Sequence, residues 1–151
     1  MEPDFPPRHT TKAEVRAEVL HTRAVRDAAE AAEADARRWA RVQAALRRMS
    51  PPTVACYVSA GTEPGTLELL DDLLEWGVRI LLPAAHSAHD PAWADWAGEA
   101  LVAGYAGIPV PPGPPLPPDA LAAADVVILP GLAGTAGGIR LGRGGGWYDR
   151  A

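Results

Sequence analysis

The chain has 151 residues, 48% of them hydrophobic, which suits one domain with its own core. Its formal net charge of −5 at pH 7 argues against a general nucleic-acid-binding surface. No apolar run approaches the roughly 18 residues that cross a membrane, and the first residues lack the apolar segment of a signal peptide. Cys56 is the single cysteine, so no disulfide forms within the chain, and a reducing, cytoplasmic location is expected. It lies in an apolar run that is typical of a core.

A long helical region opens the chain and leads into a buried strand. Residues 1–10 contain three prolines and are expected to form a disordered lead. Residues 11–49 are rich in Ala, Arg and Glu and contain neither Gly nor Pro, so they predict two helices with a break near residues 27–35. The sequence Ser-Pro-Pro at 50–52 ends this region, and residues 53–59 predict a buried strand.

The middle of the chain alternates between helical and extended patterns. Apolar residues at helical spacing predict a helix over 66–76 that ends at Gly77. Residues 78–82 predict a second buried strand and residues 83–92 a loop, while residues 93–102 fit either a strand or a helix.

Prolines dominate the connection to the third strand. Residues 109–118 hold seven prolines and predict a stiff connector that is neither helix nor central strand. A short helix is expected within 116–124, and residues 125–129 predict a third apolar strand. This order of elements predicts that residues 11–151 form a single three-layer α/β/α domain, with a largely parallel sheet and an N-terminal helical segment.

A glycine- and arginine-rich segment, residues 138–150, follows the third strand. Glycines fill positions 142, 144, 145 and 146, so the backbone can curl around a ligand. Arg140, Arg143 and Arg150 lie in the same segment, although residues 51–151 hold only four basic side chains against eleven acidic ones. Because ligands bind beyond the carboxyl ends of parallel strands, this placement favours a local anion site over a solvated surface.

The residue types in this segment point to phosphate. Guanidinium groups and converging backbone N–H groups form anion-binding concavities, and Asp149 adds the kind of oxygen ligand that holds phosphate-bound Mg²⁺. The segment is not a Walker loop, because a Gly-Lys-Ser/Thr ending is missing and Lys12 is the single lysine of the chain. A dinucleotide fingerprint is disfavoured because no helix has room to follow the glycines.

This segment resembles the nucleotide loop of the 5-formyltetrahydrofolate cyclo-ligase family, also called methenyltetrahydrofolate synthetase, whose signature is Arg-Leu-Gly-x-Gly-x-Gly-x-Tyr-Asp. The specified positions are filled by Arg140, Leu141, Gly142, Gly144, Gly146, Tyr148 and Asp149. Trp147 stands where the family usually has Tyr or Phe, and Gly145 stands where it often has Lys. The resemblance extends over about residues 11–150.

The resemblance also gives a role to cations near the start of the chain. Lys12, Arg16 and Arg23 share one face of the first predicted helix, and on their own they are typical of a solvated basic stripe. The family has a Lys-x-x-x-Arg at the start of its first helix that contacts the nucleotide phosphates, and Lys12 and Arg16 match it.

Folate contacts are implied at a different set of residues. Glu63 lies in a strand-to-helix turn, where a carboxylate suits a helix start, and it matches a family Glu that contacts the folate. Trp96 could stack on the folate rings, although core packing and a competing Trp93 remain open. Tyr148 matches a position that lines the family's site.

The loop after the second strand contains three residues of types that can ligate metals. His86, His89 and Asp90 have a spacing that could suit a metal, but the absence of a fourth ligand disfavours that interpretation.

The resemblance implies ATP-dependent cyclisation of 5-formyltetrahydrofolate to 5,10-methenyltetrahydrofolate, with release of ADP and phosphate. Lys12, Arg16 and the catalytic pair Arg140 and Arg143 would neutralise the phosphates. The segment from Leu141 to Tyr148, with the backbone amides of Gly142, Gly144, Gly145 and Gly146 and with Trp147, would hold the nucleotide, and Asp149 would hold Mg²⁺.

Two departures from the family pattern keep alternatives open. First, Gly134 and Thr135 stand where the family usually has an aromatic or aliphatic residue followed by Asp. Second, family members continue beyond the Tyr-Asp with a further strand, a further helix and a metal-ligating Asp. The chain is therefore expected to lack these C-terminal elements and to be a monomer or weak homo-oligomer. The alternatives are a truncated, non-catalytic paralogue that binds nucleotide or folate, and an unrelated glycine-rich phosphate-binding domain.

Overall fold

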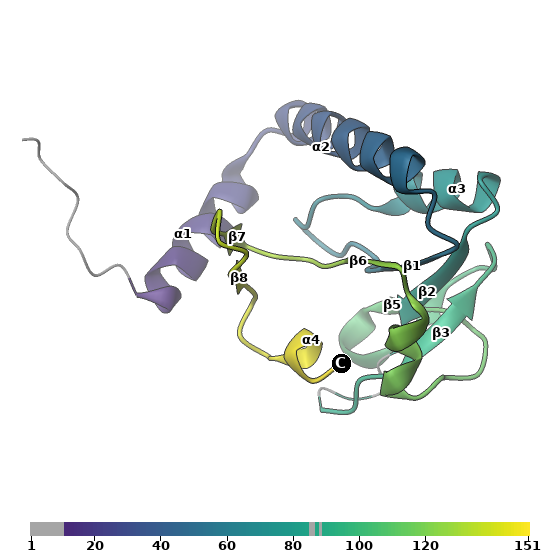
Figure 1. Ribbon diagram of the computed structural model, residues 1–151. Helices are drawn as coiled ribbons and strands as arrows, with labels where there is room; N and C mark the ends of the chain where they lie inside the picture. The colour runs from purple at the N-terminus through teal and green to yellow at the C-terminus, as the bar shows by residue number, and fades with distance from the viewer. Residues whose placement is uncertain (1–10, 85–86, 88) are drawn as a thin grey trace, which may run out of the picture.

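The computed structural model describes residues 11–84, 87 and 89–151, so the expected lead at 1–10 and His86 lie outside the described residues (Figure 1). The helices are α1 (Lys12–Val25), α2 (Ala28–Met49), α3 (Leu67–Glu75) and α4 (Trp147–Arg150), with 3₁₀ turns η1 (Tyr105–Gly107) and η2 (Pro118–Ala123). The strands are β1 (Thr53–Cys56), β2 (Arg79–Pro83), β3 (Trp93–Trp96), β4 (Val102–Ala103), β5 (Pro109–Val110), β6 (Val126–Ile128), β7 (Ala133–Gly134) and β8 (Arg140–Leu141).

The helical region divides into two helices, as predicted, and side-chain caps explain where. Thr11 and Glu14 form a reciprocal capping box at the start of α1. Asp27 accepts hydrogen bonds from the backbone N–H groups of Ala29 and Glu30 and begins α2. The break therefore lies at the near edge of the expected window, at Arg26 and Asp27.

The central sheet has the strand order β3-β2-β1-β6, in which β1 runs parallel to β2 and β6. This confirms the predicted largely parallel sheet. Residues 93–102, which fitted two structures, begin with the edge strand β3, antiparallel to β2. In the proline-rich connector, the short strand β5 pairs with β4 in a separate ribbon, and Leu116 forms one antiparallel bridge with Trp93 at the edge of the central sheet.

The two faces of the sheet carry different layers (Figure 1). Alternate side chains of β1 and β2 point to opposite faces. One face packs against α2 and α3 through Val54, Cys56, Ile80, Leu82, Trp39, Leu46, Leu69, Leu70 and Leu73. The other face packs against η2 and α4 through Ala55, Leu81, Trp93, Leu121, Trp147 and Tyr148. This arrangement is the expected three-layer fold, with short helical turns forming the third layer.

Several loops meet where the parallel strands end. The loop from β1 to α3 and the loop from β6 to β7 both leave the carboxyl edge of the sheet. The β7–β8 ribbon lies beyond that edge, and α1 lies beside the ribbon (Figure 1). None of the described helices has the length and apolar character needed to cross a bilayer.

Candidate active site

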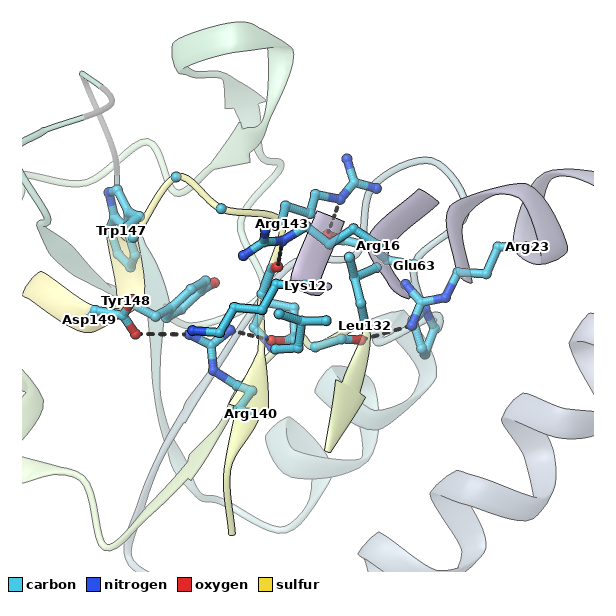
Figure 2. Close-up of a pocket in the computed structure, with 18 residues that line it drawn as sticks. Lys12, Arg16, Arg23, Glu63, Leu132, Arg140, Arg143, Trp147, Tyr148 and Asp149 are labelled. Carbon is cyan, nitrogen blue, oxygen red and sulfur yellow. Dashed lines mark hydrogen bonds and ion pairs between the residues drawn. The ribbon is translucent and has the colours of Figure 1, made fainter. Parts of the chain in front are cut away.

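A cavity of about 310 Å³ opens where these loops meet (Figure 2). It is lined by α1, the β1–α3 loop, the β6–β7 loop, β8, the glycine-rich loop and α4. The residues expected from the sequence that line it are Lys12, Arg16, Glu63, Arg140, Leu141, Gly142, Arg143, Gly144, Gly145, Gly146, Trp147, Tyr148 and Asp149. The fold therefore brings together residues that are more than one hundred positions apart in the chain.

Two arginines of α1 bind backbone carbonyls on the far side of the cavity. Nε of Arg16 donates to the carbonyl oxygen of Gly142 at 2.9 Å, and Nη2 of Arg23 donates to that of Gly131 at 2.8 Å. Because α1 contains no buried residue, these charged hydrogen bonds are the main contacts by which the described structure attaches this helix to the rest of the fold.

Arg140 is held from several directions at the centre of the cavity. Its Nη1 donates to the carbonyl oxygen of Pro130 at 2.9 Å, and its Nη2 lies 3.3 Å from Oδ1 of Asp149. The guanidinium carbon also lies 5.7 Å from the centre of the Tyr148 ring. The side chain is thus fixed before any ligand binds, which limits the reorganisation that an incoming anion would cost.

Glu63 and Arg143 form a looser pair at the rim. Nε of Arg143 lies 3.8 Å from Oε1 of Glu63, and their side chains are 57% and 16% exposed. The other oxygen of Glu63 accepts the backbone N–H of Ala60 at 2.9 Å, which fixes the carboxylate within its own turn. Arg143 is consequently the more mobile partner of the two.

The glycine-rich loop needs glycine at two of its positions for conformational reasons. Gly144 has φ +108° and Gly146 has φ +65°, both in the region that other residues rarely adopt. At Gly142 the requirement is space, because a Cβ there would lie 2.9 Å from Nη1 of Arg140. The loop and Arg140 are therefore fitted to each other.

The aromatic residues of α4 form the floor of the cavity. The Trp147 ring packs edge-on against Tyr148 at 4.8 Å and against Trp93 at 5.5 Å. Burial, and to a lesser extent the charge of Glu63, raises the pKa of Tyr148 above its ordinary value. Tyr148 is thus a neutral phenol at physiological pH.

The structure places Trp96 away from this cavity. Its Nε1 donates to the carbonyl oxygen of Glu99 at 2.8 Å, and its ring packs on the α2–α3 side of the sheet. Trp93 is buried beneath Trp147 on the other face. The described residues contain no group of three or more His, Cys, Asp or Glu side chains arranged to hold a metal.

Sequence reasoning did not assign every residue that lines the cavity. Arg23, Pro64, Pro130, Gly131 and Leu132 also line it. The helical spacing of Arg23 from Lys12 and Arg16 was the available signal for that residue. Pro130, Gly131 and Leu132 begin a Pro-Gly-Leu-Ala segment that resembles the family, which was the signal for them, whereas Pro64 contributes through loop geometry.

A parallel α/β sheet with an arginine- and glycine-lined cavity beyond its strand ends is the architecture of an anion-binding enzyme. The model of the 5-formyltetrahydrofolate cyclo-ligase family matches residues 8–151. The chain belongs to this family of enzymes, which confirms the resemblance carried by its glycine-rich segment.

Individual relatives agree with this assignment. The chain is 41% identical over 147 residues to a 5-formyltetrahydrofolate cyclo-ligase from Mycolicibacterium smegmatis, covering 93% of this chain and 74% of the relative. The NMR structure of Aquifex aeolicus 5,10-methenyltetrahydrofolate synthetase superposes with a TM-score of 0.77 at 25% identity, covering 93% of this chain and 71% of that one. A 5,10-methenyltetrahydrofolate synthetase from Mycoplasma pneumoniae shares the fold, with a TM-score of 0.71 at 20% identity over 93% and 76% of the two chains.

Proposed function

We propose that this chain catalyses the ATP-dependent cyclisation of 5-formyltetrahydrofolate to 5,10-methenyltetrahydrofolate, with release of ADP and phosphate. The observation that carries the proposal is the charge of the cavity. Five cationic side chains and two carboxylates line it, although the chain as a whole has a net charge of −5. Such a local excess of positive charge suits a polyphosphate, and family membership supplies the folate.

The phosphates are assigned to the side of the cavity formed by α1, β8 and the glycine-rich loop. Lys12 and Arg16 line it from α1, Arg140 from β8 and Arg143 from the glycine-rich loop (Figure 2). Arg16 and Arg140 are already oriented by the carbonyls of Gly142 and Pro130. Preorganised cations of this kind stabilise charge that develops during phosphoryl transfer.

The folate is assigned to the side of the cavity near Glu63 and Tyr148. A reduced pterin offers ring N–H and amino donors, for which the mostly buried carboxylate of Glu63 is a suitable acceptor. The neutral ring of Tyr148 adds an apolar surface beside it. The folate would then enter next to the arginines that hold the phosphates.

In this arrangement the chemistry consists of two bond exchanges. The formyl oxygen attacks the γ-phosphorus, the bond from that phosphorus to the bridging oxygen breaks, and ADP leaves. N10 then attacks the formyl carbon, loses its proton, and phosphate departs with the former formyl oxygen. Arg140 and Arg143 are assigned to neutralise charge on the transferred group, so positioning replaces a protein nucleophile.

The residues present also fit a phosphate-bound Mg²⁺. Nucleotide sites hold this ion with one or two carboxylates together with phosphate oxygens and water. Asp149 is 77% exposed beside Arg140, which leaves its carboxylate accessible to such an ion. When bound there, Mg²⁺ would neutralise part of the phosphate charge.

An absorbance assay of the purified chain with 5-formyltetrahydrofolate, ATP and Mg²⁺ tests the proposal. We expect ATP-dependent growth of methenyltetrahydrofolate absorbance, and we expect Arg140→Ala to abolish it. Arg79→Ala is the matched control, because Arg79 pairs with Asp95 on exposed parts of β2 and β3, outside the cavity. Saturable ATP binding without product would overturn the proposed catalysis, and an unchanged rate in Arg140→Ala would overturn the site.

A further inference from the structure

Two neighbouring carbonyls of the β6–β7 loop each accept a hydrogen bond from a different arginine. Pro130 accepts from Nη1 of Arg140 at 2.9 Å, and Gly131 accepts from Nη2 of Arg23 at 2.8 Å. In Figure 2 the two arginines reach these oxygens from opposite sides. These two consecutive peptide units therefore connect a side chain of α1 to a side chain of β8.

Gly131 also lies beside the stem of Arg140. A Cβ built on Gly131 would meet Cγ of Arg140 at 3.4 Å, which is an ordinary van der Waals contact. The next residue, Leu132, is buried, and its backbone N–H donates to the carbonyl oxygen of Leu141 at 2.8 Å. A displacement of Gly131 would therefore be transmitted to the stem of Arg140 and to its neighbour Leu141.

We propose that Arg23 is a positioning residue that orients Arg140 by holding the carbonyl of Gly131. This role rests on the proposed function, in which Arg140 neutralises the transferred phosphoryl group. Arg23 holds the Gly131–Leu132 peptide. Because this peptide shares the Cα atom of Gly131 with the Pro130–Gly131 peptide, it fixes the carbonyl of Pro130 that directs the Arg140 guanidinium. Through the same hydrogen bond, Arg23 attaches α1, which also carries Lys12 and Arg16.

The geometry separates this role from direct binding of phosphate. Arg23 lies seven residues beyond Arg16 on α1, which corresponds to about 10 Å along a helix. Arg16 donates to the glycine-rich loop, whereas Arg23 donates to the β6–β7 loop. The guanidinium of Arg23 therefore donates a hydrogen bond to the protein backbone, at a distance from the glycines that are assigned to the phosphates.

The first test uses ligand-free protein, so it does not depend on the proposed function. NMR order parameters of the Arg140 Nε–H group are compared among the wild type, Arg23→Ala and Arg26→Ala. Arg26 is an exposed arginine just beyond the end of α1 and does not line the cavity. We expect the Arg140 side chain to lose order in Arg23→Ala only. Equal order in all three proteins would overturn the proposal.

The second test is a double-mutant cycle for ATP affinity. We expect Arg23→Ala alone to weaken ATP binding about tenfold, because a misoriented Arg140 would lose a charge-assisted hydrogen bond to phosphate. An Arg140→Lys background keeps the charge but loses the planar guanidinium group. In that background, Arg23→Ala should raise the Kd for ATP less than about twofold. Equal losses in both backgrounds would show that Arg23 contacts the nucleotide independently, and no loss in either would show that it does not act on the site.

Two controls make these outcomes decisive. If Arg23→Ala lacks a cooperative thermal transition, Arg23→Lys replaces it in both tests, because it keeps a cation but has a single donor group. If the wild type binds no ATP, the proposed function fails, while the order parameters of Arg140 still decide whether Arg23 positions that side chain.

Discussion

Removal of the Glu63 charge should tighten ATP binding, although Glu63 lines the same cavity. In the ligand-free protein Glu63 holds Arg143, with 3.8 Å between Oε1 and Nε. A triphosphate must draw Arg143 away from this carboxylate before it can use the cation. Glu63→Gln removes the competitor for Arg143 while keeping the size of the side chain.

The size of the effect follows from the geometry of the pair. Two unit charges 3.8 Å apart attract by about 4 kcal/mol at an effective dielectric constant of about 20. Arg143 is 57% exposed, so hydration and side-chain entropy reduce the net value to about 1 kcal/mol. Release of Arg143 should therefore lower the Kd for ATP about fivefold. Binding of 5-formyltetrahydrofolate should weaken, because Glu63 is its assigned acceptor.

Isothermal titration of ATP into the variant and the wild type measures this difference. Glu68→Gln is the matched control, since Glu68 is an exposed residue of α3 outside the cavity and undergoes the same change of charge. In an Arg143→Gln background, Glu63→Gln should leave the Kd for ATP unchanged. An unchanged or higher Kd in the single variant would refute the reasoning that Glu63 restrains Arg143.

Three other perturbations have defined outcomes. Gly142→Ala places Cβ 2.9 Å from Nη1 of Arg140 and should weaken ATP binding about tenfold. The control is Gly113→Ala, which meets nothing within 4 Å, lies outside the cavity and should titrate like the wild type. Identical curves for the two variants would contradict the fit of the loop to Arg140. Leu73→Ala removes a fully buried side chain and should lower the free energy of unfolding by about 2–5 kcal/mol in denaturant melts, and a loss well below that range would argue against its core position. Burial raises the pKa of the Cys56 thiol from 9.0 to about 12, so the native state keeps this proton longer than the unfolded chain and stability falls as the pH rises above 9.0. Denaturant melts at about pH 8 and about pH 10 measure this fall in the free energy of unfolding, and the fall should be smaller in Cys56→Ala.

Local patterns in the sequence predicted the parts of the fold that depend on local interactions. The break before α2 follows from Asp27, which caps the helix with its own side chain. The strands β1, β2 and β6 are short apolar runs, and their parallel pairing follows from the helix or connector between them. Residues 93–102 could not be resolved in this way, because β3 forms only through pairing with β2 and burial of Trp93.

The candidate site likewise contains residues that local sequence patterns predict and contacts that only the folded chain defines. The glycine-rich segment has a fixed register, so the cations and glycines within it could be named from the sequence alone. The approach of α1 to that segment depends on contacts between distant parts of the chain, such as the bond from Arg23 to Gly131. Trp96 and Trp93 lie three residues apart on β3, and only the packing of the sheet decides which face each one covers.

The polar attachment of α1 gives the chain two levels of stability. The sheet and α2 and α3 are joined through buried apolar side chains, whereas α1 has none. Its opening therefore requires the loss of a few hydrogen bonds rather than exposure of the core, and it can occur without global unfolding. Amide hydrogen exchange in α1 should thus be faster than in α2 and α3. A ligand that bridges Lys12 and the glycine-rich loop would raise the free energy of opening α1 by RT ln(1 + [L]/Kd) and slow its exchange by the factor 1 + [L]/Kd.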